Sequence, residues 1–409
     1  MDPPIEAPMD APMPVEQEDN LSVLHIGKYF PPSFGGIESF MSQLMVEQQK
    51  SGIEVAAIVH QSAPDYAGEQ QSWNGCRVYN AKSYGQVAYA PIAPKFLWVL
   101  RGALDEIKPD IIHIHLPNLS AFWLLVLSIF SSKKSKWIIH WHSDVLGAVP
   151  DLKVKVLYPL YRIFEKWLLK KADAVICTSP NYLESSKPLL SYRNKCHVVP
   201  LGISIPEGTQ EPSISTSHDG NTLRLIYIGR LTYYKGHALL FEAIKLLNAQ
   251  GKKIILDVVG EGELEAQLKA IVSSERLEDC ILFHGGLSED EKYRLLNQAD
   301  MLCLPSIERT EAFGMVLLEA AALGKPALVS DVYGSGMSFV VQHQKSGLVV
   351  KSNSVESLYA NLAWASDNVG QLKVYGQTAH IRFVEEFSIE KASWAMAAIY
   401  AGGTDYSVR

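Results

Sequence analysis

The sequence has few of the residues that tie a fold together covalently or through a metal. Its 409 residues include only five cysteines, and no two of them form a Cys-x-x-Cys pair. A disulfide framework and a cysteine-ligated zinc site are therefore not expected, and a reducing, cytoplasmic compartment fits best. The Gly-x-Ser-x-Gly, His-Glu-x-x-His and P-loop patterns are absent too, so the hydrolase, metalloprotease and triphosphatase chemistries they mark are not indicated.

Long apolar runs are also missing. The longest, Ala121 to Phe130, is shorter than the roughly 18 to 20 residues that a spanning helix needs. Residues 1–20 hold six acids, five prolines and no base, so they lack the basic start and apolar core of a signal peptide. We interpret them as a disordered acidic tail and expect a protein that stays in the cytoplasm.

Positive charge is scarce overall but concentrated in one segment. The chain carries 37 Lys and Arg against 44 Asp and Glu, a net charge of -7, yet residues 133–171 contain nine bases and three acids. Such a local excess favours an anionic partner. The alternative is an ordinary solvated basic face.

The chain contains short apolar, β-branched runs that alternate with helical stretches of ten or more residues. This alternation predicts βαβ units and parallel sheets, an α/β fold. The first half predicts strands at 21–27, 54–60, 110–115, 137–142, 174–178 and 196–200, with helices at 39–50, 93–108 and 152–172. The second half predicts strands at 223–229, 253–259, 280–284, 301–305 and 326–330.

A run of turn-forming residues separates the two halves. Residues 206–222 are almost all Pro, Gly, Ser, Thr, Asn, Asp or Glu, which indicates a linker. We therefore predict a doubly wound Rossmann-like domain at 21–205 and a second at 223–387. Residues 388–409 are assigned to a C-terminal helix that crosses back to the first domain. Since ligands of open α/β sheets bind at the carboxyl ends of the strands, two such domains facing each other would enclose a cleft.

Two cations follow the first strand of the second domain. In Gly229-Arg230-Leu-Thr-Tyr-Tyr-Lys235-Gly236, Arg230 and Lys235 lie on one short loop at a strand end. A guanidinium and an ammonium that converge there would suit a diphosphate, and Gly236 would let a helix begin close to it. The alternative is that both are solvated surface charges.

Three further groups lie after strands. The pair Gly35-Gly36 opens a helix and allows close backbone approach to a phosphate or sugar, or is simply a turn. Glu311 precedes a helix, Met315 to Leu323, that carries Glu319; both carboxylates could accept bonds from sugar hydroxyls, or serve as cap and solvated face. His142 ends a strand, while His113 and His115 are assigned to packing.

Together these segments resemble the retaining glycosyltransferases of family 4, which have the GT-B architecture. The resemblance rests on Gly35-Gly36, Trp141-His142-Ser143-Asp144, the Gly229–Gly236 loop and the Glu-x7-Glu pair Glu311 and Glu319, all in this order. It extends from residue 21 to about 400. The pattern is also similar to the bacterial subset that builds O-antigen, capsule or exopolysaccharide, often mannosyl or rhamnosyl transferases.

The resemblance implies roles for the donor-binding residues. Arg230 and Lys235 would neutralise the departing diphosphate, and Glu319 would bind the nucleotide ribose. Glu311 would contact the transferred sugar, assisted by backbone N–H groups at Phe313, Gly314 and Met315. Among these, Arg230, Lys235 and Glu311 are counted as catalytic.

The first domain would complete the donor site and hold the acceptor. His142, also counted as catalytic, would meet the primary-alcohol side of the sugar, and Gly35-Gly36 would pass the phosphates. The resemblance further implies transfer without a metal or other cofactor. It favours GDP-mannose as donor, with a UDP-sugar-dependent glucosyl or N-acetylglucosaminyl transferase as the alternative. No nucleic-acid partner is indicated.

A basic, aromatic-rich stretch in the first domain predicts contact with an anionic membrane and a lipid-diphosphate-linked saccharide acceptor. The residues assigned to this side are Glu38, Lys153, Lys155, Lys166, Lys170 and Lys171. The protein would then lie peripherally on the inner face of the cytoplasmic membrane. Alternatively, Leu157, Leu160, Phe164 and Leu168 are core residues of an ordinary helix.

Two alternative functions from other protein classes are also compatible with the sequence. A sugar-nucleotide epimerase or a phosphorylase could use the same two-domain architecture, although an epimerase would not need the Arg230/Lys235 loop together with Glu311/Glu319. A non-catalytic binding subunit could keep the fold without the chemistry, but none of these four residues has been lost.

Overall fold

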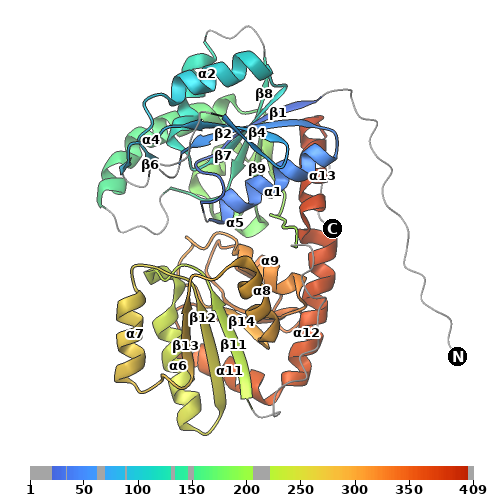
Figure 1. The fold of residues 1–409 in the computed structure, drawn as a ribbon. Coiled ribbons are helices and arrows are strands. Elements are labelled where there is room, and N and C mark those ends of the chain that lie inside the picture. Colours follow the sequence, from blue (N-terminus) through green and yellow to red (C-terminus); the bar gives the residue numbers. More distant parts are fainter. Residues whose placement is uncertain are drawn as a thin grey trace, which may run out of the picture.

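The computed structural model describes residues 21–33, 35–61, 70–87, 90–129, 134–145, 152–205 and 222–403. The acidic tail at 1–20 and nearly all of the predicted linker lie outside these residues. Within them, the chain forms two α/β domains, one above the other in Figure 1. The predicted α/β class, with two doubly wound units, is confirmed.

The N-terminal domain is built on an eight-stranded sheet in the order β10-β9-β8-β7-β1-β2-β4-β3. Its neighbours pair in parallel except β3 and β4, which are antiparallel. The strands are β1 (Ser22–Ile26), β2 (Glu54–His60), β3 (Gln70–Trp73), β4 (Cys76–Ala81), β7 (Ile111–Leu116), β8 (Lys136–Trp141), β9 (Ala174–Cys177) and β10 (Cys196–Val198). A small separate hairpin pairs β5 (Gln86–Val87) with β6 (Ala90–Pro91).

Helices cover both faces of this sheet. Side chains of α1 pack with the odd-numbered residues of β1, such as Val23, and those of α2 and α4 pack with the even-numbered ones, such as Leu24. The period of two in a strand explains this division between the two faces. The helical segments are α1 (Gly36–Lys50), α2 (Phe96–Ile107), η1 (Leu119–Phe122), α3 (Trp123–Leu127), α4 (Leu152–Lys171), α5 (Pro180–Ser185) and η2 (Lys187–Lys195).

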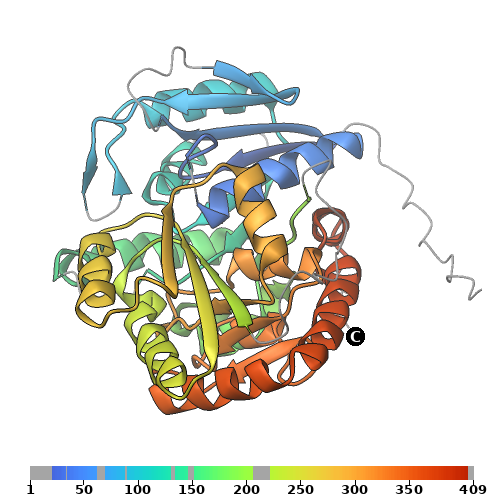
Figure 2. The ribbon, with the colours of Figure 1, turned by 60° about the horizontal axis from the view of Figure 1, so that its bottom comes forward.

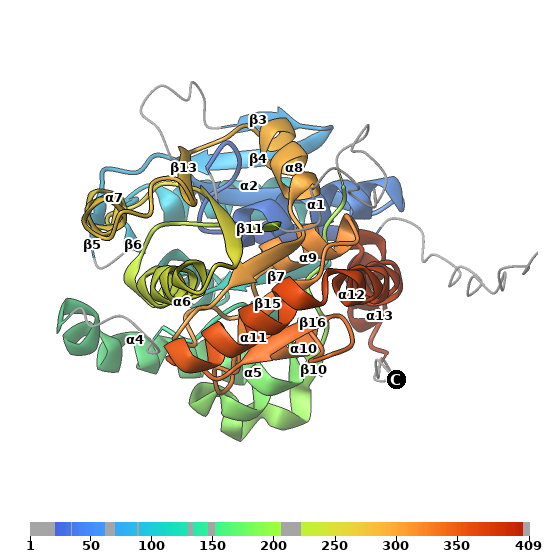
Figure 3. The same ribbon diagram turned by 90° about the horizontal axis from the view of Figure 1, so that it is seen from below.

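The C-terminal domain contains an all-parallel sheet in the order β13-β12-β11-β14-β15-β16. Its strands are β11 (Thr222–Ile228), β12 (Lys253–Val259), β13 (Ile281–Gly285), β14 (Met301–Leu304), β15 (Ala327–Ser330) and β16 (Gly347–Val350). Figure 3 shows α8 and α9 on one side of these strands and α6 and α11 on the other. The helical segments are η3 (Tyr233–Lys235), α6 (His237–Ala249), α7 (Glu265–Ser274), α8 (Glu289–Gln298), α9 (Met315–Ala322), α10 (Met337–Val340), α11 (Val355–Asp367) and α12 (Val369–Arg382).

The chain ends by returning to the N-terminal domain. After α12, a π-helical turn, η4 (Phe383–Phe387), leads into α13 (Ile389–Tyr400). In Figures 1 and 2 these red helices run along one side of the molecule from the lower domain to the upper one. There α13 packs against α1, and an isolated bridge joins Ile203 to Ser388. The return places residues of the last helix beside the N-terminal sheet.

Strands predicted from apolar runs lie within one or two residues of their expected bounds. Strands β3 to β6 and β16 were not expected: they are two to six residues long, and several lie at sheet edges. Among the described residues, no helix is both long and apolar enough to cross a membrane.

Candidate functional site

The carboxyl ends of the two sheets face each other, and segments that follow them make the contacts between domains. A Cβ placed on Gly36 would lie 3.1 Å from Cγ of Met315, so the start of α1 approaches the start of α9 closely. Asp144, which follows β8, accepts an ion-paired hydrogen bond of 2.8 Å from Nη1 of Arg309. The region predicted to hold a ligand is therefore the meeting point of the domains.

Arg309 and Asp144 are embedded in a set of polar contacts. Trp141 and Ser186 both donate to Oδ1 of Asp144, at 2.8 and 2.7 Å. The guanidinium of Arg309 lies 4.0 Å from the ring centroid of Tyr182. Burial and the nearby Asp144 carboxylate raise the pKa of Tyr182, so its hydroxyl stays protonated. These contacts satisfy a buried charge pair on both sides, which fixes the domains relative to each other.

Lys235 and Glu311 form an ion pair next to the strand ends of β11 and β14. Both side chains are largely buried, and Ser306 donates a 3.2 Å hydrogen bond to the same carboxylate oxygen, Oε2. Gly236, with φ of 73°, follows directly, and a Cβ there would collide with the carbonyl oxygen of Pro305. Only glycine allows this combination of left-handed backbone and close approach.

Arg230 does not join Lys235 on a common partner in this structure. Its side chain is 72% exposed, and Nε lies 3.5 Å from Oε2 of Glu263. The two cations of this loop therefore have different partners. Lys235 points inward and pairs with Glu311, whereas Arg230 lies at the surface near Glu263. An exposed arginine is free to turn toward an incoming anion.

Glu319 pairs with a lysine that the sequence did not suggest. On α9, its Oε2 lies 3.0 Å from Nζ of Lys292 on α8, and Lys292 also bonds Glu289 at 2.9 Å. Burial raises the pKa of Glu319, and the positive charge of Lys292 opposes that shift. Phe313 is buried just before α9, and Gly314 forms the N-cap of that helix.

The predicted glycine pair lies at the start of α1. Gly35 is the N-cap residue in an extended conformation, and the carboxylate of Glu38 folds back against it. Burial raises the pKa of Glu38, and Lys28 is the nearby positive charge that opposes this. The Glu38 carboxylate therefore lies against the N-terminal end of its own helix, near Lys28.

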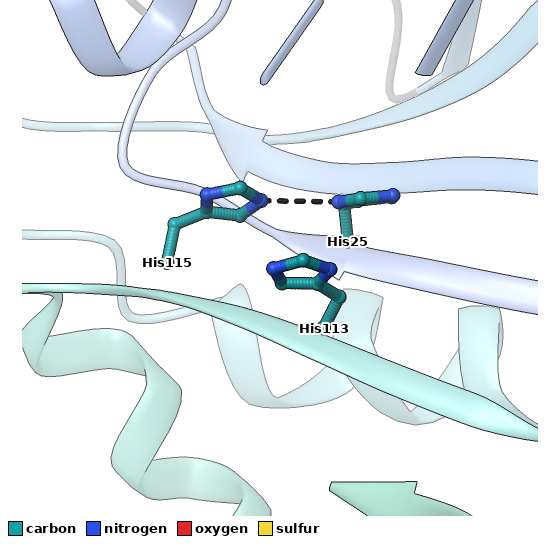
Figure 4. A group of neighbouring side chains, drawn as sticks. All are labelled: His25, His113 and His115. Atoms are coloured by element: carbon teal, nitrogen blue, oxygen red, sulfur yellow. Dashed lines mark hydrogen bonds between the residues drawn. The ribbon is translucent and has the colours of Figure 1, made fainter. Parts of the chain in front are cut away.

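His142 lies in a cluster of five buried histidines between the central strands and helices α1 and α13. We call this the histidine cluster; Figure 4 shows three of its members, His25, His113 and His115, and the other two are His140 and His142. The rings stack: those of His140 and His142 are 4.1 Å apart and nearly parallel. Burial lowers the pKa of His25 to about 4 and that of His142 to about 3, and holds the other three well below the usual value.

Two triads of this cluster have enough nitrogen atoms near one another to be considered for a metal: His25, His113 and His115, and His115, His140 and His142, with ligand atoms within 4.8 Å. Several of these nitrogens already face one another in hydrogen bonds of 2.9 to 3.3 Å. A metal would have to lie in the plane of each ring, along a lone pair. Stacked, mutually bonded rings favour a hydrogen-bonded cluster instead.

Helix α4 presents an apolar face to the surface. Five side chains on one side of it are exposed, with Val156 at 68% and Trp167 at 58%; the others are Leu157, Leu160 and Ile163. The core alternative therefore fails for Leu157 and Leu160, whereas Leu168 is buried and Phe164 packs half-buried against the core. Lys155, Lys166, Lys170 and Lys171 are exposed on the same helix, while the side chain of Lys153 lies outside the described residues.

Neighbouring segments extend this face. Trp123 is 40% and Ile129 is 75% exposed, and the Nζ of Lys171 hydrogen-bonds Ser128 between them in sequence. In Figures 1 and 3, α4 lies on the side of the molecule opposite α12 and α13. We call α4 with Trp123 to Ile129 the α4 surface.

Sequence reasoning missed Lys292, Arg309, His25, Gln48 and Tyr400. Lys292 and Arg309 lie in helical or loop segments with no motif of their own, so no local signal was available. The histidine cluster to which His25 belongs did carry a local signal, because His113 and His115, and likewise His140 and His142, alternate with apolar residues at a period of two. That alternation places the two members of each pair on the same face of their strand.

Comparison with known proteins finds a glycosyltransferase family in each half of the chain. Residues 35–202 match the family described as "Glycosyl transferase 4-like domain", and residues 210–381 match "Glycosyl transferases group 1". The O-antigen chain mannosyltransferase C of Escherichia coli is 29% identical over 384 residues, covering 93% of this chain and 98% of that protein. The D-rhamnosyltransferase WbpZ of Pseudomonas aeruginosa is 28% identical over 373 residues, covering 90% and 92%.

A solved structure shares the fold across both domains. Sucrose-phosphate synthase from Thermosynechococcus elongatus superposes with a TM-score of 0.76 at 20% identity, covering 93% of this chain and 98% of that one. The similarity extends over nearly the whole length of each chain, so the arrangement of the two domains is shared as well as each domain.

Proposed function

The chain belongs to the family 4 glycosyltransferases of GT-B architecture, and on that premise we propose that it is a retaining, metal-independent hexosyltransferase of bacterial surface polysaccharide synthesis. The donor is a nucleoside-diphosphate sugar, with GDP-mannose favoured. The observation that carries this proposal is the pair Lys235–Glu311, held at the strand ends where the domains meet. The two relatives are named for transfer of mannose and D-rhamnose, which have the same manno configuration.

The donor exchanges partners with this ion pair. Its diphosphate takes Lys235 as counter-ion, while Glu311 turns its oxygens to hydroxyls of the sugar. Arg230, already exposed, swings in as the second cation. Positive groups fixed where negative charge develops on the leaving phosphate stabilise the transition state more than the ground state.

The nucleotide end binds Glu319. Lys292 favours the ionised form of that buried carboxyl, and an ionised carboxylate accepts two hydrogen bonds from adjacent ribose hydroxyls. Without Lys292, burial would favour the protonated form and weaken the acceptor.

Transfer with retention follows from attack on the face that the diphosphate leaves. The acceptor hydroxyl forms a bond to C1 of the sugar as the C1–O bond to phosphate breaks. The leaving phosphate oxygen takes the hydroxyl proton, so no separate base and no covalent enzyme intermediate are needed. Each atom and charge is then accounted for by donor and acceptor alone.

The α4 surface brings the protein to its acceptor. Exposed apolar side chains beside lysines are the composition of a helix that rests in the interface of an anionic membrane. A saccharide attached to a lipid diphosphate would be presented there. This supports an acceptor that is lipid-linked and a protein that binds the membrane peripherally.

A donor panel tests the proposal. The full chain is incubated with GDP-mannose, UDP-glucose, UDP-N-acetylglucosamine, ADP-glucose and dTDP-rhamnose, with and without EDTA, and nucleoside diphosphate release is measured. We expect release chiefly from GDP-mannose, unaffected by EDTA, as the sugar passes slowly to water, and an α-linked product when a lipid-linked saccharide acceptor is added. Epimerised donor without release would favour an epimerase, and binding without either would favour a non-catalytic subunit; each overturns the proposal.

A further inference from the structure

The histidine cluster forms one continuous hydrogen-bonded network with two residues of the surrounding helices. One arm runs from Gln48 on α1 through His25 and His115 to His142, with nitrogen and oxygen separations of 2.8, 3.0 and 2.9 Å. This arm therefore connects a buried residue on the last turn of α1 to His142, which directly follows β8.

The second arm starts at the same glutamine. Nε2 of Gln48 donates to the hydroxyl of Tyr400 on α13 at 3.0 Å, and that hydroxyl bonds Nδ1 of His113. His113 in turn bonds Nδ1 of His140 at 3.3 Å. Tyr400 and Gln48 are 352 positions apart, so the C-terminal helix completes the network.

The amide of Gln48 gives the first arm a direction. Its Oε1 can only accept, so Nε2 of His25 must carry the proton. Because burial keeps these histidines neutral, each carries one proton: His25 Nδ1 accepts from His115 Nε2, and His115 Nδ1 accepts from His142 Nε2. The arm ends with an unprotonated Nδ1 on His142.

That terminal atom has no hydrogen-bond partner in the part of the chain that the structure describes, although His142 is only 4% exposed. A buried acceptor left unsatisfied destabilises the folded protein. In the other arm, the Tyr400 hydroxyl accepts from Gln48 and so donates to Nδ1 of His113, whose Nε2 then donates to His140; that arm ends on a protonated Nε2 of His140, which also has no partner among the described residues. Nδ1 of His142 is therefore a buried acceptor that no described side chain uses.

We infer that Gln48 is a positioning residue that fixes His142 as the Nε2–H tautomer, and that Tyr400 orients the Gln48 amide by accepting from its Nε2, so that Nδ1 of His142 accepts a hydrogen bond from a hydroxyl of the donor sugar. This inference rests on the proposed function, since it needs a sugar at the domain interface. It makes α13 part of the active-site support: the last helix of the chain orients a residue in the first domain.

Substitutions at Gln48 test the direction of the network. In Gln48→Met, the amide that sets both arms is removed at nearly constant volume. In Gln48→Glu, both oxygens accept, so Tyr400 donates to Glu and the second arm reverses, while the first keeps its direction. Gln49→Met and Gln49→Glu, on the exposed neighbour, are matched controls.

The readout is ¹⁵N NMR of histidine-labelled full chain at pH 7.5, without substrate. We expect protonated Nε2 on His142 in the wild type, mixed tautomers along the first arm in Gln48→Met, and protonated Nδ1 on His113 and His140 in Gln48→Glu. The controls should match the wild type. A protonated Nδ1 on wild-type His142 would overturn the inference, and so would histidine tautomers that are the same in the wild type and in both Gln48 variants. Stoichiometric zinc or nickel bound by these nitrogens would overturn it as well.

Kinetics connects the tautomer to catalysis. Gln48→Met should lower kcat about tenfold, the scale of one misplaced hydrogen bond, with the Kd for nucleoside diphosphate unchanged. Unchanged kcat in a folded Gln48→Met protein with mixed tautomers would overturn the assigned role. A wild-type protein that transfers no sugar, but shows the expected tautomers, would count against the proposed function and not against tautomer control.

Discussion

The two domains have similar doubly wound sheets but keep their polar side chains at different depths. In the N-terminal domain, β1, β7 and β8 carry histidines into the core, where they are neutral and bond one another. In the C-terminal domain, the side chains proposed to bind the donor are charged and lie at the strand ends, as Lys235 and Glu311 do. The difference shows that neutral hydrogen-bonded groups tolerate full burial, whereas ions need an opposite charge or solvent nearby.

The largest expected difference between the domains is their stability in acid, which should destabilise the N-terminal domain more than the C-terminal one. Folding lowers the pKa of five clustered histidines below the unfolded value of 6.5, so the unfolded state binds more protons as pH falls from about 6.5 toward 4. Each group then removes about 1.4 kcal/mol of stability per pH unit. In the C-terminal domain, His237 is the described histidine with a comparable lowering of its pKa.

Calorimetry at pH 7.5, 6.5 and 5.5, with hydrogen exchange to locate the opening, measures this. We expect Tm to fall with pH and peptides of β1, β7 and β8 to lose protection before those of β11 and β14. The raised pKa values of Glu165, about 7 because of burial, and of Glu38 contribute in the opposite direction, but the five clustered histidines outnumber these two groups. Opening that begins in the C-terminal domain would contradict the comparison.

Membrane contact should belong to the N-terminal domain alone. Lysines beside an anionic surface contribute about 1 kcal/mol each, so replacing those of the α4 surface should weaken vesicle binding at least about 100-fold at low salt. The variant changes Lys153, Lys155, Lys166, Lys170 and Lys171 to Gln. Sedimentation with vesicles rich in phosphatidylglycerol measures it, and raising salt should reduce wild-type binding, because charges beyond about 10 Å are screened at 0.1 M.

The control for that experiment is an equal loss of charge in the other domain. Five exposed lysines there serve: Lys253, Lys269, Lys345, Lys351 and Lys373. The control should sediment like the wild type, and both variants should bind nucleotide normally. Equal loss of binding in both would show that only net charge matters and that the α4 surface is an ordinary face.

The largest losses of turnover should come from substitutions in the C-terminal domain. Lys235→Ala should lower turnover about 100-fold, the scale of losing a group that stabilises the transition state, and Arg230→Ala by a similar factor. Steady-state release of nucleoside diphosphate measures both. Lys253→Ala, on the exposed start of β12, is the control. Near-normal turnover in both folded variants would remove the basis of the proposed mechanism.

The two carboxylates should differ in kind. Glu319→Ala should weaken nucleotide binding about tenfold, because it removes hydrogen bonds to the ribose, and leave kcat nearly unchanged. Glu311→Ala should mainly lower kcat, because it removes contacts to the reacting sugar. Titration calorimetry with nucleoside diphosphate, beside turnover, separates them, and identical defects would argue against separate roles.

Much of the fold was predictable because its signals are local. A buried parallel strand is a continuous apolar run, and β2 and β12 have the bounds that their runs predict. Short edge strands such as β3, with Gln and Ser exposed or half-exposed, carry no such run, and they form only because β4 is already there to pair with them. The glycines of the motifs were likewise found from sequence, since a turn between strand and helix needs them.

The partners of the site residues were decided by tertiary structure. The sequence by itself determined that Lys235, Glu311, Glu319 and His142 follow strand ends. Only the folded chain decided that Lys235 faces Glu311 while Arg230 faces solvent. It also brought Lys292 to Glu319 and carried Tyr400 across the molecule to Gln48. Such contacts join residues far apart in sequence, and because a hydrogen bond between distant residues imposes no spacing on the chain, no pattern in the sequence records it.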